Sequence, residues 1–262
     1  MVCNARKEDF LGNPKNKQAF LEYLGDVLKK DGCEVLHAEG DADTLIVNTA
    51  VICAVNATTV VIGEDTDLLV LLLYHADLRS RPLFLKSELK TKKHKVIDIL
   101  LMKPRLGPEI CNFLPFLHAI NGCDTTSRLF GVAKGFPLKK IKTNADFKAA
   151  AETFCTKGKT TADIIASGEK ALVSLYGGRA GDTLDMLRYK RLWEKVVSSI
   201  TTVQVRSLPQ TSAAAKYHSL RVYLQVQDWI DKICDLRRGD GIYLLADWTH
   251  VQQISHLLPS FC

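Results

Sequence analysis

The stretch from Val60 to Leu73, VVIGEDTDLLVLLL, places three carboxylates inside an apolar run. A run this apolar predicts a buried strand or a buried helix. Burying a charged side chain is costly unless a partner compensates it. We therefore expect Glu64, Asp65 and Asp67 to lie at the rim of the core, where a strand ends and a loop begins.

The residues around this run predict a parallel β-α-β unit. Residues 33–38 (CEVLHA) alternate as a short strand does, residues 45–53 place apolar side chains on one helical face, and residues 58–63 (TTVVIG) are β-branched. This order of elements implies parallel strands with a right-handed connection. Ligands bind beyond the carboxyl ends of parallel strands, which is where Asp65 and Asp67 are predicted to lie.

Most of the remaining chain is predicted to be helical. Residues 1–17 are polar and are expected to form no element, and an amphipathic helix is expected at 16–30. Strand-like pieces are expected within 81–100. Apolar spacing and capping residues then predict helices at 142–154, 161–178 and 182–200, and a long one after Pro209. The tail, residues 241–248 and 256–262, is expected to return as a strand or to drape over the core.

Composition is typical of a globular protein in a reducing compartment. Hydrophobic residues make up 47% and charged residues 24%, and no apolar run approaches the roughly 20 residues that span a bilayer. The first residues show no secretory h-region, and the eight cysteines show no metal-binding spacing. We expect an intracellular protein, nuclear or cytoplasmic, with buried thiols and no membrane partner. The net charge of +6 is compatible with a polyanionic partner.

Acidic residues recur at the predicted loop ends of one sheet. Each has an ordinary explanation, because carboxylates are favoured by roughly 0.3 to 1 kcal/mol at helix N-termini and Asp124 could be a helix cap. Together, however, clustered carboxylates repel one another unless a cation is present. Mg²⁺ and Mn²⁺ prefer such oxygens, and a pair of ions ~3.5 to 4 Å apart serves phosphodiester hydrolysis. The candidate ligands of two such ions are Asp41, Asp43, Asp65, Asp67 and Asp124.

Three motifs occur in an order that is similar to a known nuclease family. GDADT (40–44) precedes GEDTDLL (63–69), and GCDTTSRLFGVAKG (122–135) follows. This order resembles the flap-endonuclease (XPG-like) branch of the PIN-like nucleases. The phrases EDTDLLVLLLYHA, LHAINGCDTTS and LPQTSAAAKYH also look like uncharacterised invertebrate proteins that occur in many copies per genome. The likeness covers roughly 19–260.

The resemblance implies a fold and a domain organisation. The fold would be α/β, with a PIN-like, Rossmann-like parallel sheet flanked by helices. In the family, an N-terminal part supplies the first strand of the sheet, and this chain is expected to lack that part. The sheet is therefore expected to be incomplete at its N-terminus and to leave an apolar edge. Residues 1–18 would be a loose lead-in, 19–145 the nuclease-related domain, and 146–262 a helical extension with an irregular or short-strand tail.

The resemblance also implies a function. It assigns catalysis to Asp43, Asp65, Asp67 and Asp124, which with Asp41 would bind Mg²⁺ or Mn²⁺, while Glu64 would orient the turn. The implied activity is structure-specific hydrolysis of nucleic acid, with DNA favoured over RNA. The alternative is an inert nuclease-derived module that binds nucleic acid or a protein. The residues matched to the family's backbone-binding hairpin, with two neighbouring lysines, are Gly131, Lys134, Gly135, Lys139 and Lys140.

Several other features have ordinary explanations. The basic stretch 86–95 and the lysines of 134–142 either contact phosphates or form solvated loops. His118 is expected to be a hydrogen-bonded core residue, and the three tryptophans are expected to pack in the core. No aromatic residues alternate with these basic stretches, so a platform for single strands is not indicated. A D-x-D turn after a strand also occurs in haloacid-dehalogenase-type phosphatases, whose motif is Asp-x-Asp-x-Thr/Val. Here Leu68 and Leu69 follow Asp67, so the sequence departs from that motif. The tryptophans are Trp193, Trp229 and Trp248.

Overall fold

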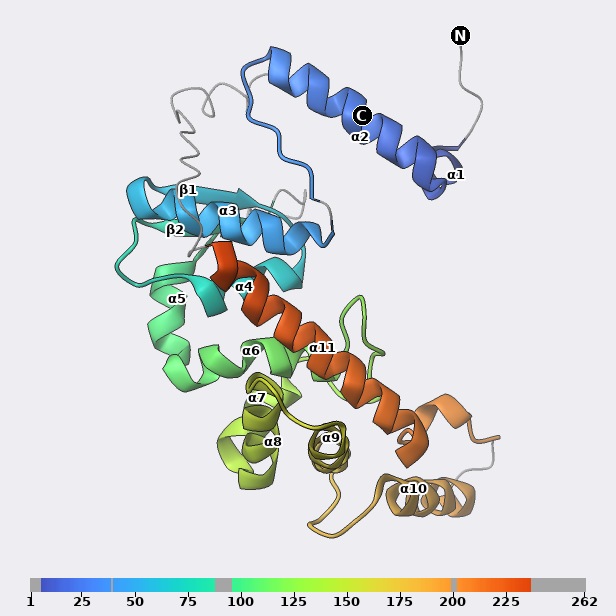
Figure 1. The fold of residues 1–262 in the computed structure, drawn as a ribbon. Helices are drawn as coiled ribbons and strands as arrows, with labels where there is room; N and C mark the ends of the chain where they lie inside the picture. The colour runs from blue at the N-terminus through green and yellow to red at the C-terminus, as the bar shows by residue number, and fades with distance from the viewer. Residues whose placement is uncertain (1–5, 39, 88–95, 199–201, 237–262) are drawn as a thin grey trace. The chain divides into compact units, whose positions relative to one another are not determined.

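The computed structural model of this chain describes residues 6–38, 40–87, 96–198 and 202–236 (Figure 1). The chain divides into two compact units after Ala42. The described residues before this point belong to the first unit, and those from Asp43 onward belong to the second.

The first unit is helical. It contains α1 (Lys7–Gly12) and α2 (Pro14–Lys30), so the expectation that the first 17 residues form no element is wrong. The reason is local: Asn13 caps α2 by accepting a hydrogen bond from the Lys15 N–H at 3.0 Å, and Pro14 suits the first helical position. The predicted helix at 16–30 is confirmed.

The predicted strand at 33–38 is wrong. These residues have no regular secondary structure, although their side chains alternate in polarity. A strand needs a neighbour for its backbone N–H and C=O groups, and alternation alone does not supply one. Within the part of the chain that the structure describes, no strand pairs with this segment.

The rest of the described chain is mostly helical, with one small sheet. Its elements are, in chain order, α3 (Ala42–Asn56), β1 (Thr59–Ile62), α4 (Thr66–His75), β2 (Leu83–Lys86), β3 (Val96–Asp98), α5 (Ile99–Leu106), α6 (Pro108–Asn121), α7 (Phe136–Thr143), α8 (Ala145–Cys155), α9 (Thr161–Leu175), α10 (Leu184–Ser198), the short 3₁₀ helix η1 (Val205–Ser207) and α11 (Ser212–Leu236).

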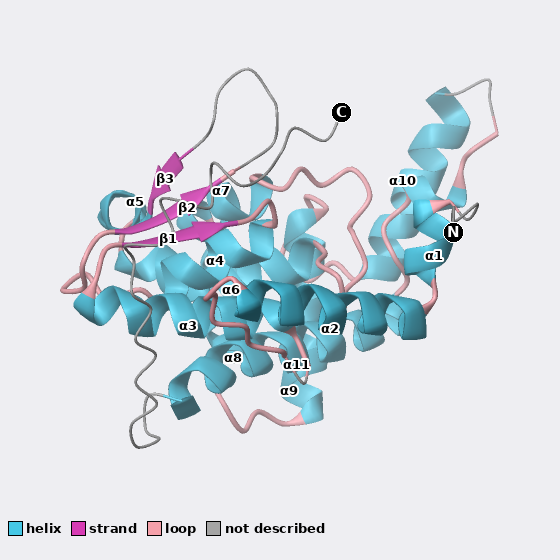
Figure 2. Ribbon diagram, turned by 90° about the horizontal axis from the view of Figure 1, so that it is seen from above, coloured by secondary structure: helices cyan, strands magenta, loops and turns pink. Residues whose placement is uncertain are grey.

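The sheet is mixed, with the strand order β1-β2-β3. β1 and β2 are parallel and are connected through α4, whereas β2 and β3 are antiparallel. The expected all-parallel sheet is therefore corrected, and the observed parallel β-α-β unit begins at β1, the strand with which the predicted unit ends. Among the described strands β1 is an edge, and α3 and α4 lie on the same side of the sheet (Figure 2). Val60 and Ile62 of β1 are exposed, while Thr59 and Val61 are buried.

One hydrophobic core connects the sheet with the helices that follow it. The long α11 runs past α6, α8 and α9 (Figure 1), and its Trp229 is 1% exposed. Phe116 of α6 packs against Phe147 and Phe154 of α8, with ring centroids 5.7 and 4.9 Å apart. No helix within the described ranges is long and apolar enough to cross a membrane.

Polar residues cap the helices of the second half at or next to the predicted helix starts. Asn144 accepts a hydrogen bond from the Phe147 N–H at the start of α8. Thr160 and Asp163 form a capping box at the start of α9, and Thr211 accepts from the Ala214 N–H at the start of α11. These signals lie within a few residues of the helix that they start, which is why the sequence reveals them. The predicted tail, residues 241–248 and 256–262, lies outside the described residues.

α9 and α11 approach each other closely at Gly168. A Cβ atom on Gly168 would lie 1.9 Å from Ser219 Oγ and 2.5 Å from Ser219 Cβ. Both residues are buried, and Ser219 Oγ donates to the Ala215 carbonyl oxygen at 2.8 Å. The close packing of the two helices therefore requires glycine at this position.

We expect Gly168→Ala to lower the free energy of unfolding by roughly 1 to 3 kcal/mol, because the added methyl overpacks the contact between the helices. Chemical denaturation would measure the loss. The control is Gly135→Ala, which adds a methyl where nothing lies within 4 Å and where φ is −84°. Equal stability of Gly168→Ala and Gly135→Ala would contradict the packing argument.

Candidate functional site

Asp65 and Asp67 lie at the turn that joins β1 to α4. Asp65 is the N-cap of α4, and its Oδ1 accepts a hydrogen bond from the Asp67 N–H at 3.0 Å. A Cβ atom on Gly63 would lie 2.5 Å from Leu68 Cδ1, so a larger residue here would displace the end of the Leu68 side chain. The turn thus has a local explanation that requires no ligand.

Glu64 ties the ends of the two parallel strands together. Ser87 Oγ, just after β2, lies 2.9 Å from Glu64 Oε1 and 2.7 Å from Oε2. The resemblance implied that Glu64 orients the turn, and in the structure its carboxylate lies beside the end of β2.

Asp67 is paired with His118. His118 Nε2 lies 2.6 Å from Asp67 Oδ1, and each side chain is only 11% exposed. The imidazole also lies beside the indole of Trp229, with ring centroids 6.0 Å apart. The expectation of a hydrogen-bonded core histidine is confirmed. The contact joins the first turn of α4 to the last turn of α6.

The GCDTTS motif forms a compact loop at the end of α6. Gly122 has φ +111°, and a Cβ there would lie 2.5 Å from the Arg128 Cα. Both the backbone conformation and the close approach of Arg128 therefore require glycine. Thr126 Oγ1 donates to the Ala119 carbonyl oxygen at 2.7 Å and accepts from the Cys123 N–H at 3.0 Å. It therefore closes the open end of α6.

Asp124 is exposed within this loop. Its neighbour Thr125 donates to Gln225 Oε1 of α11 at 2.5 Å, which attaches the loop to that helix. Sequence reasoning did not anticipate this contact, because one hundred residues separate its partners. No local signal could have revealed it.

The predicted metal ligands do not form a preassembled centre. Among the described residues, no three His, Cys, Asp or Glu side chains are grouped so as to hold a metal ion. Asp67 is engaged by His118, and Asp65 Oδ1 by the start of α4. Asp43 lies in the first turn of α3, and Asp41 belongs to the first unit. These residues do not fit a built two-ion site.

The predicted backbone-binding segment is exposed and strongly basic. Lys134, Lys139 and Lys142 are exposed and Lys140 is partly buried, and none of the four forms an ion pair with a described residue. Lys139 and Lys142 are three residues apart, so they share one face of α7.

Only one of the two glycines in this region has a conformational reason to be glycine. Gly131 has φ +76°, whereas Gly135 has φ −84° and open space around it. The other basic stretch, 86–95, lies largely outside the described residues, which end at 87 and resume at 96.

The tryptophans divide into two groups. Trp229 is buried as predicted, but Trp193 is 61% exposed, so the expectation of core packing is wrong for it. Trp193 lies on α10 on the side away from that helix's buried residues, Leu184 and Leu187. Helical spacing predicts that residues share a face, but it does not say whether anything covers that face. Trp248 lies outside the described residues.

Two buried histidines and two cysteines lie elsewhere in the core. His75 Nε2 lies 2.9 Å from the Trp229 carbonyl oxygen, and His218 Nε2 donates to the Ile120 carbonyl oxygen at 3.0 Å. Burial lowers the pKa of His218, so the ring is neutral at pH 7. Burial raises the pKa of Cys155 to about 12 and also raises that of Cys111, so neither is a reactive nucleophile at neutral pH.

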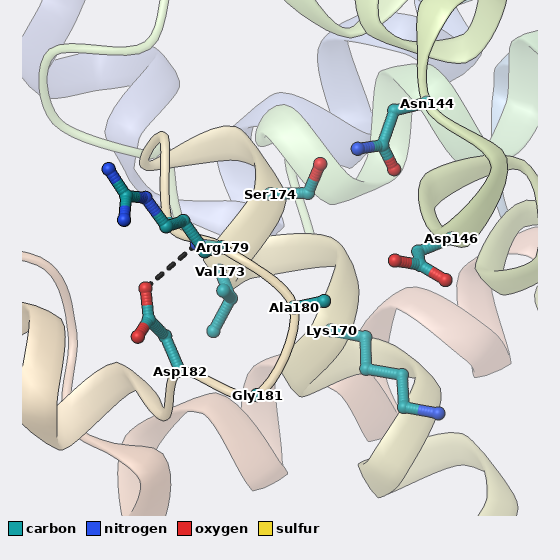
Figure 3. A pocket seen from close by; sticks show the side chains of 10 residues that line it. Asn144, Asp146, Lys170, Val173, Ser174, Arg179, Ala180, Gly181 and Asp182 are labelled. Carbon is teal, nitrogen blue, oxygen red and sulfur yellow. Dashed lines mark hydrogen bonds between the residues drawn. The ribbon is translucent and has the colours of Figure 1, made fainter.

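A cavity of about 220 Å³ lies between the start of α8, the end of α9 and the loop after α9 (Figure 3). Lys170 and Arg179 bring positive charge to its wall, and Asp146 and Asp182 bring negative charge. The Arg179 N–H donates to Asp182 Oδ2 at 2.8 Å. None of the five predicted acidic ligands lines it, nor do the lysines of the 134–142 segment.

Comparisons with protein-family models, with curated proteins and with solved structures give no match to this chain. The resemblance to flap endonucleases therefore depends on three short motifs and their order.

We expect the Asp67–His118 contact to be energetically coupled. Asp67→Leu and His118→Leu should each lower the free energy of unfolding by roughly 1 to 3 kcal/mol, because each leaves a largely buried polar partner unpaired. The double variant should lose about 1 kcal/mol less than the sum of the two singles. Denaturant unfolding of the four proteins measures this.

The matched control is the pair Asp77 and Arg79, which form an ion pair at 2.7 Å with side chains 41% and 90% exposed. Solvent screens such a pair, so its cycle should show no measurable coupling. Strict additivity at Asp67 and His118 would mean that their contact does not stabilise the fold.

Proposed function

We propose that this chain is a nuclease-derived module, PIN-like in ancestry, that binds nucleic acid through its phosphate backbone. The observation that carries the proposal is the unpaired lysine segment from Lys134 to Lys142. Its four lysines are accompanied by no acidic residue over these nine positions. The order of the three motifs supports the ancestry.

The geometry of α7 favours contact with a polyanion. Ile141 is buried and anchors the helix in the core, while Lys139 and Lys142 share the exposed face. No described carboxylate neutralises them, so their ammonium groups are available to replace counterions along a phosphate backbone. Such contacts give affinity and register without sequence specificity.

The state of the acidic residues favours binding over catalysis. Asp67 is 8% exposed and hydrogen-bonded to His118, and Asp65 caps a helix. These duties account for the EDTD motif as a structural turn. A binding module therefore needs no further assumption about the acidic residues.

We expect Lys139→Gln/Lys142→Gln to weaken binding to a mixed-sequence DNA duplex. Each lost phosphate contact should reduce the slope of log affinity against log salt by about 0.9, hence by about 1.8 for the pair. Fluorescence anisotropy over a range of KCl concentrations measures both the affinity and the slope.

The control is Lys29→Gln/Lys30→Gln, which removes the same charge from two exposed lysines at the end of α2. It should leave the slope nearly unchanged. If the two double variants lose equal slope, binding depends on net charge alone and the assignment to α7 fails. The same titration with an RNA duplex tests the expected preference for DNA.

A second candidate function is hydrolysis of nucleic acid assisted by Mg²⁺ or Mn²⁺. The observation that favours it is the exposure of Asp65 and Asp124, since Mg²⁺ is usually held by one or two carboxylates together with substrate phosphates. A site of this kind needs no preassembled group of three ligands.

For this second candidate, Asp65→Asn/Asp124→Asn should abolish Mn²⁺-stimulated cleavage of a DNA flap, while binding through the lysines persists. Asp67→Ala is a poorer test, because it leaves His118 unpaired and affects folding. Asp9→Asn/Asp26→Asn removes two exposed carboxylates of the first unit and is the control. Absence of Mn²⁺-dependent cleavage by the unmodified chain would remove this candidate and leave the binding module.

A further inference from the structure

α10 has two opposite apolar faces, of which one is packed. Leu184 and Leu187 are buried against the rest of the second unit, and α10 contacts α9. On the other side, six large apolar residues are between 39% and 70% exposed. We call this set the α10 stripe: Met186, Tyr189, Leu192, Trp193, Val196 and Val197.

The α10 stripe is large for an unpartnered surface. A tyrosine or tryptophan side chain can bury roughly 150 to 250 Å², so six large residues at these exposures present on the order of 600 Å². The largest apolar patch of a typical monomer is about 300 to 600 Å². One partner of a standard interface contributes roughly 800 Å². The stripe therefore has nearly the area of half an interface.

We propose that the α10 stripe pairs with the α10 stripe of a second copy of this chain, with the two helices side by side and parallel. The spacing fits a short seam between helices. Met186, Tyr189, Trp193 and Val196 follow one another at intervals of three, four and three residues, which is the spacing of the a and d positions of a heptad.

The residues that flank this seam select the second copy as the occupant. In a parallel pair, each g position faces the e position five residues later on the partner helix. Asp185 then faces the partner's Lys190, and Leu192 faces the partner's Val197. One pair has opposite charges and the other is apolar on both sides, so every exposed residue of the seam meets a compatible one.

An antiparallel pair is less compatible. There the e positions face each other, which places Lys190 near the partner's Lys190 and leaves Asp185 without a basic partner. Like charges at such positions are destabilising. The charge pattern therefore favours one orientation as well as one occupant.

Sedimentation velocity of the full chain over a series of concentrations tests the pairing. We expect a reversible dimer, and Tyr189→Ser/Trp193→Ser should raise its dissociation constant by about tenfold or more, since buried aromatic side chains dominate interface energetics. Tyr217→Ser/Leu224→Ser is the matched control, because these residues of α11 are 60% and 68% exposed. The control should dimerise as the unmodified chain does.

A chain that stays monomeric at every concentration overturns the proposal. Equal loss of dimer in the two double variants overturns it as well, because the effect would not be specific to α10. Normal dimerisation of the α10 variant places the interface elsewhere. If the unmodified chain is monomeric and the α10 variant loses nucleic-acid binding, the stripe serves a nucleic acid instead.

Disulfide formation tests the orientation. In the parallel pair Met186 lies against the partner's Met186, so Met186→Cys should give a covalent dimer under mild oxidation that the unmodified chain does not give. In the antiparallel pair the two positions are separated by about 15 Å along the helices. A disulfide needs Cα atoms within about 7 Å. A dimer that Met186→Cys does not cross-link overturns the parallel arrangement.

Discussion

The hydrogen bond between Asp67 and His118 fixes how α4 lies against α6. Leu71 and Leu72 of α4 and Phe116 of α6 are fully buried, but apolar burial is non-directional and does not by itself fix one arrangement of the helices. The polar pair has only one good arrangement. Moving α4 by one turn would leave both groups unpaired in a largely dry environment, at a cost of roughly 1 to 3 kcal/mol for each. The position of the sheet edge relative to the 122–135 loop depends on this contact.

This contact also explains why the acidic motifs alone do not define a function. Two of the residues that the resemblance assigns to catalysis have a structural duty in this fold, because Asp65 caps α4 and Asp67 is hydrogen-bonded to His118. Such duties maintain the spacing of the motif whether or not a metal ion is bound. Evidence for function must therefore come from groups with no structural duty, such as the exposed lysines of α7.

Sequence reasoning succeeded where the signal is local and failed where a distant partner decides. The caps at Asn144 and Thr160 fix the starts of α8 and α9, because the cap and the amide that it accepts from are three residues apart. Segment 33–38 has the polarity of a strand but lacks a paired neighbour among the described residues. Trp193 has the spacing of a core residue, yet nothing in its own helix says what lies opposite.

The two proposed surfaces depend on different forces, and they reinforce each other if both exist. Contacts between Lys139, Lys142 and phosphates weaken steeply with salt, whereas burial of the α10 stripe does not. A dimer joined along α10 carries two copies of the lysine segment. The second contact with one long polyanion is then intramolecular, so its effective concentration is set by geometry and not by the concentration of free protein. Weak, nonspecific phosphate contacts thereby become sufficient for stable association, without any further contact in either copy.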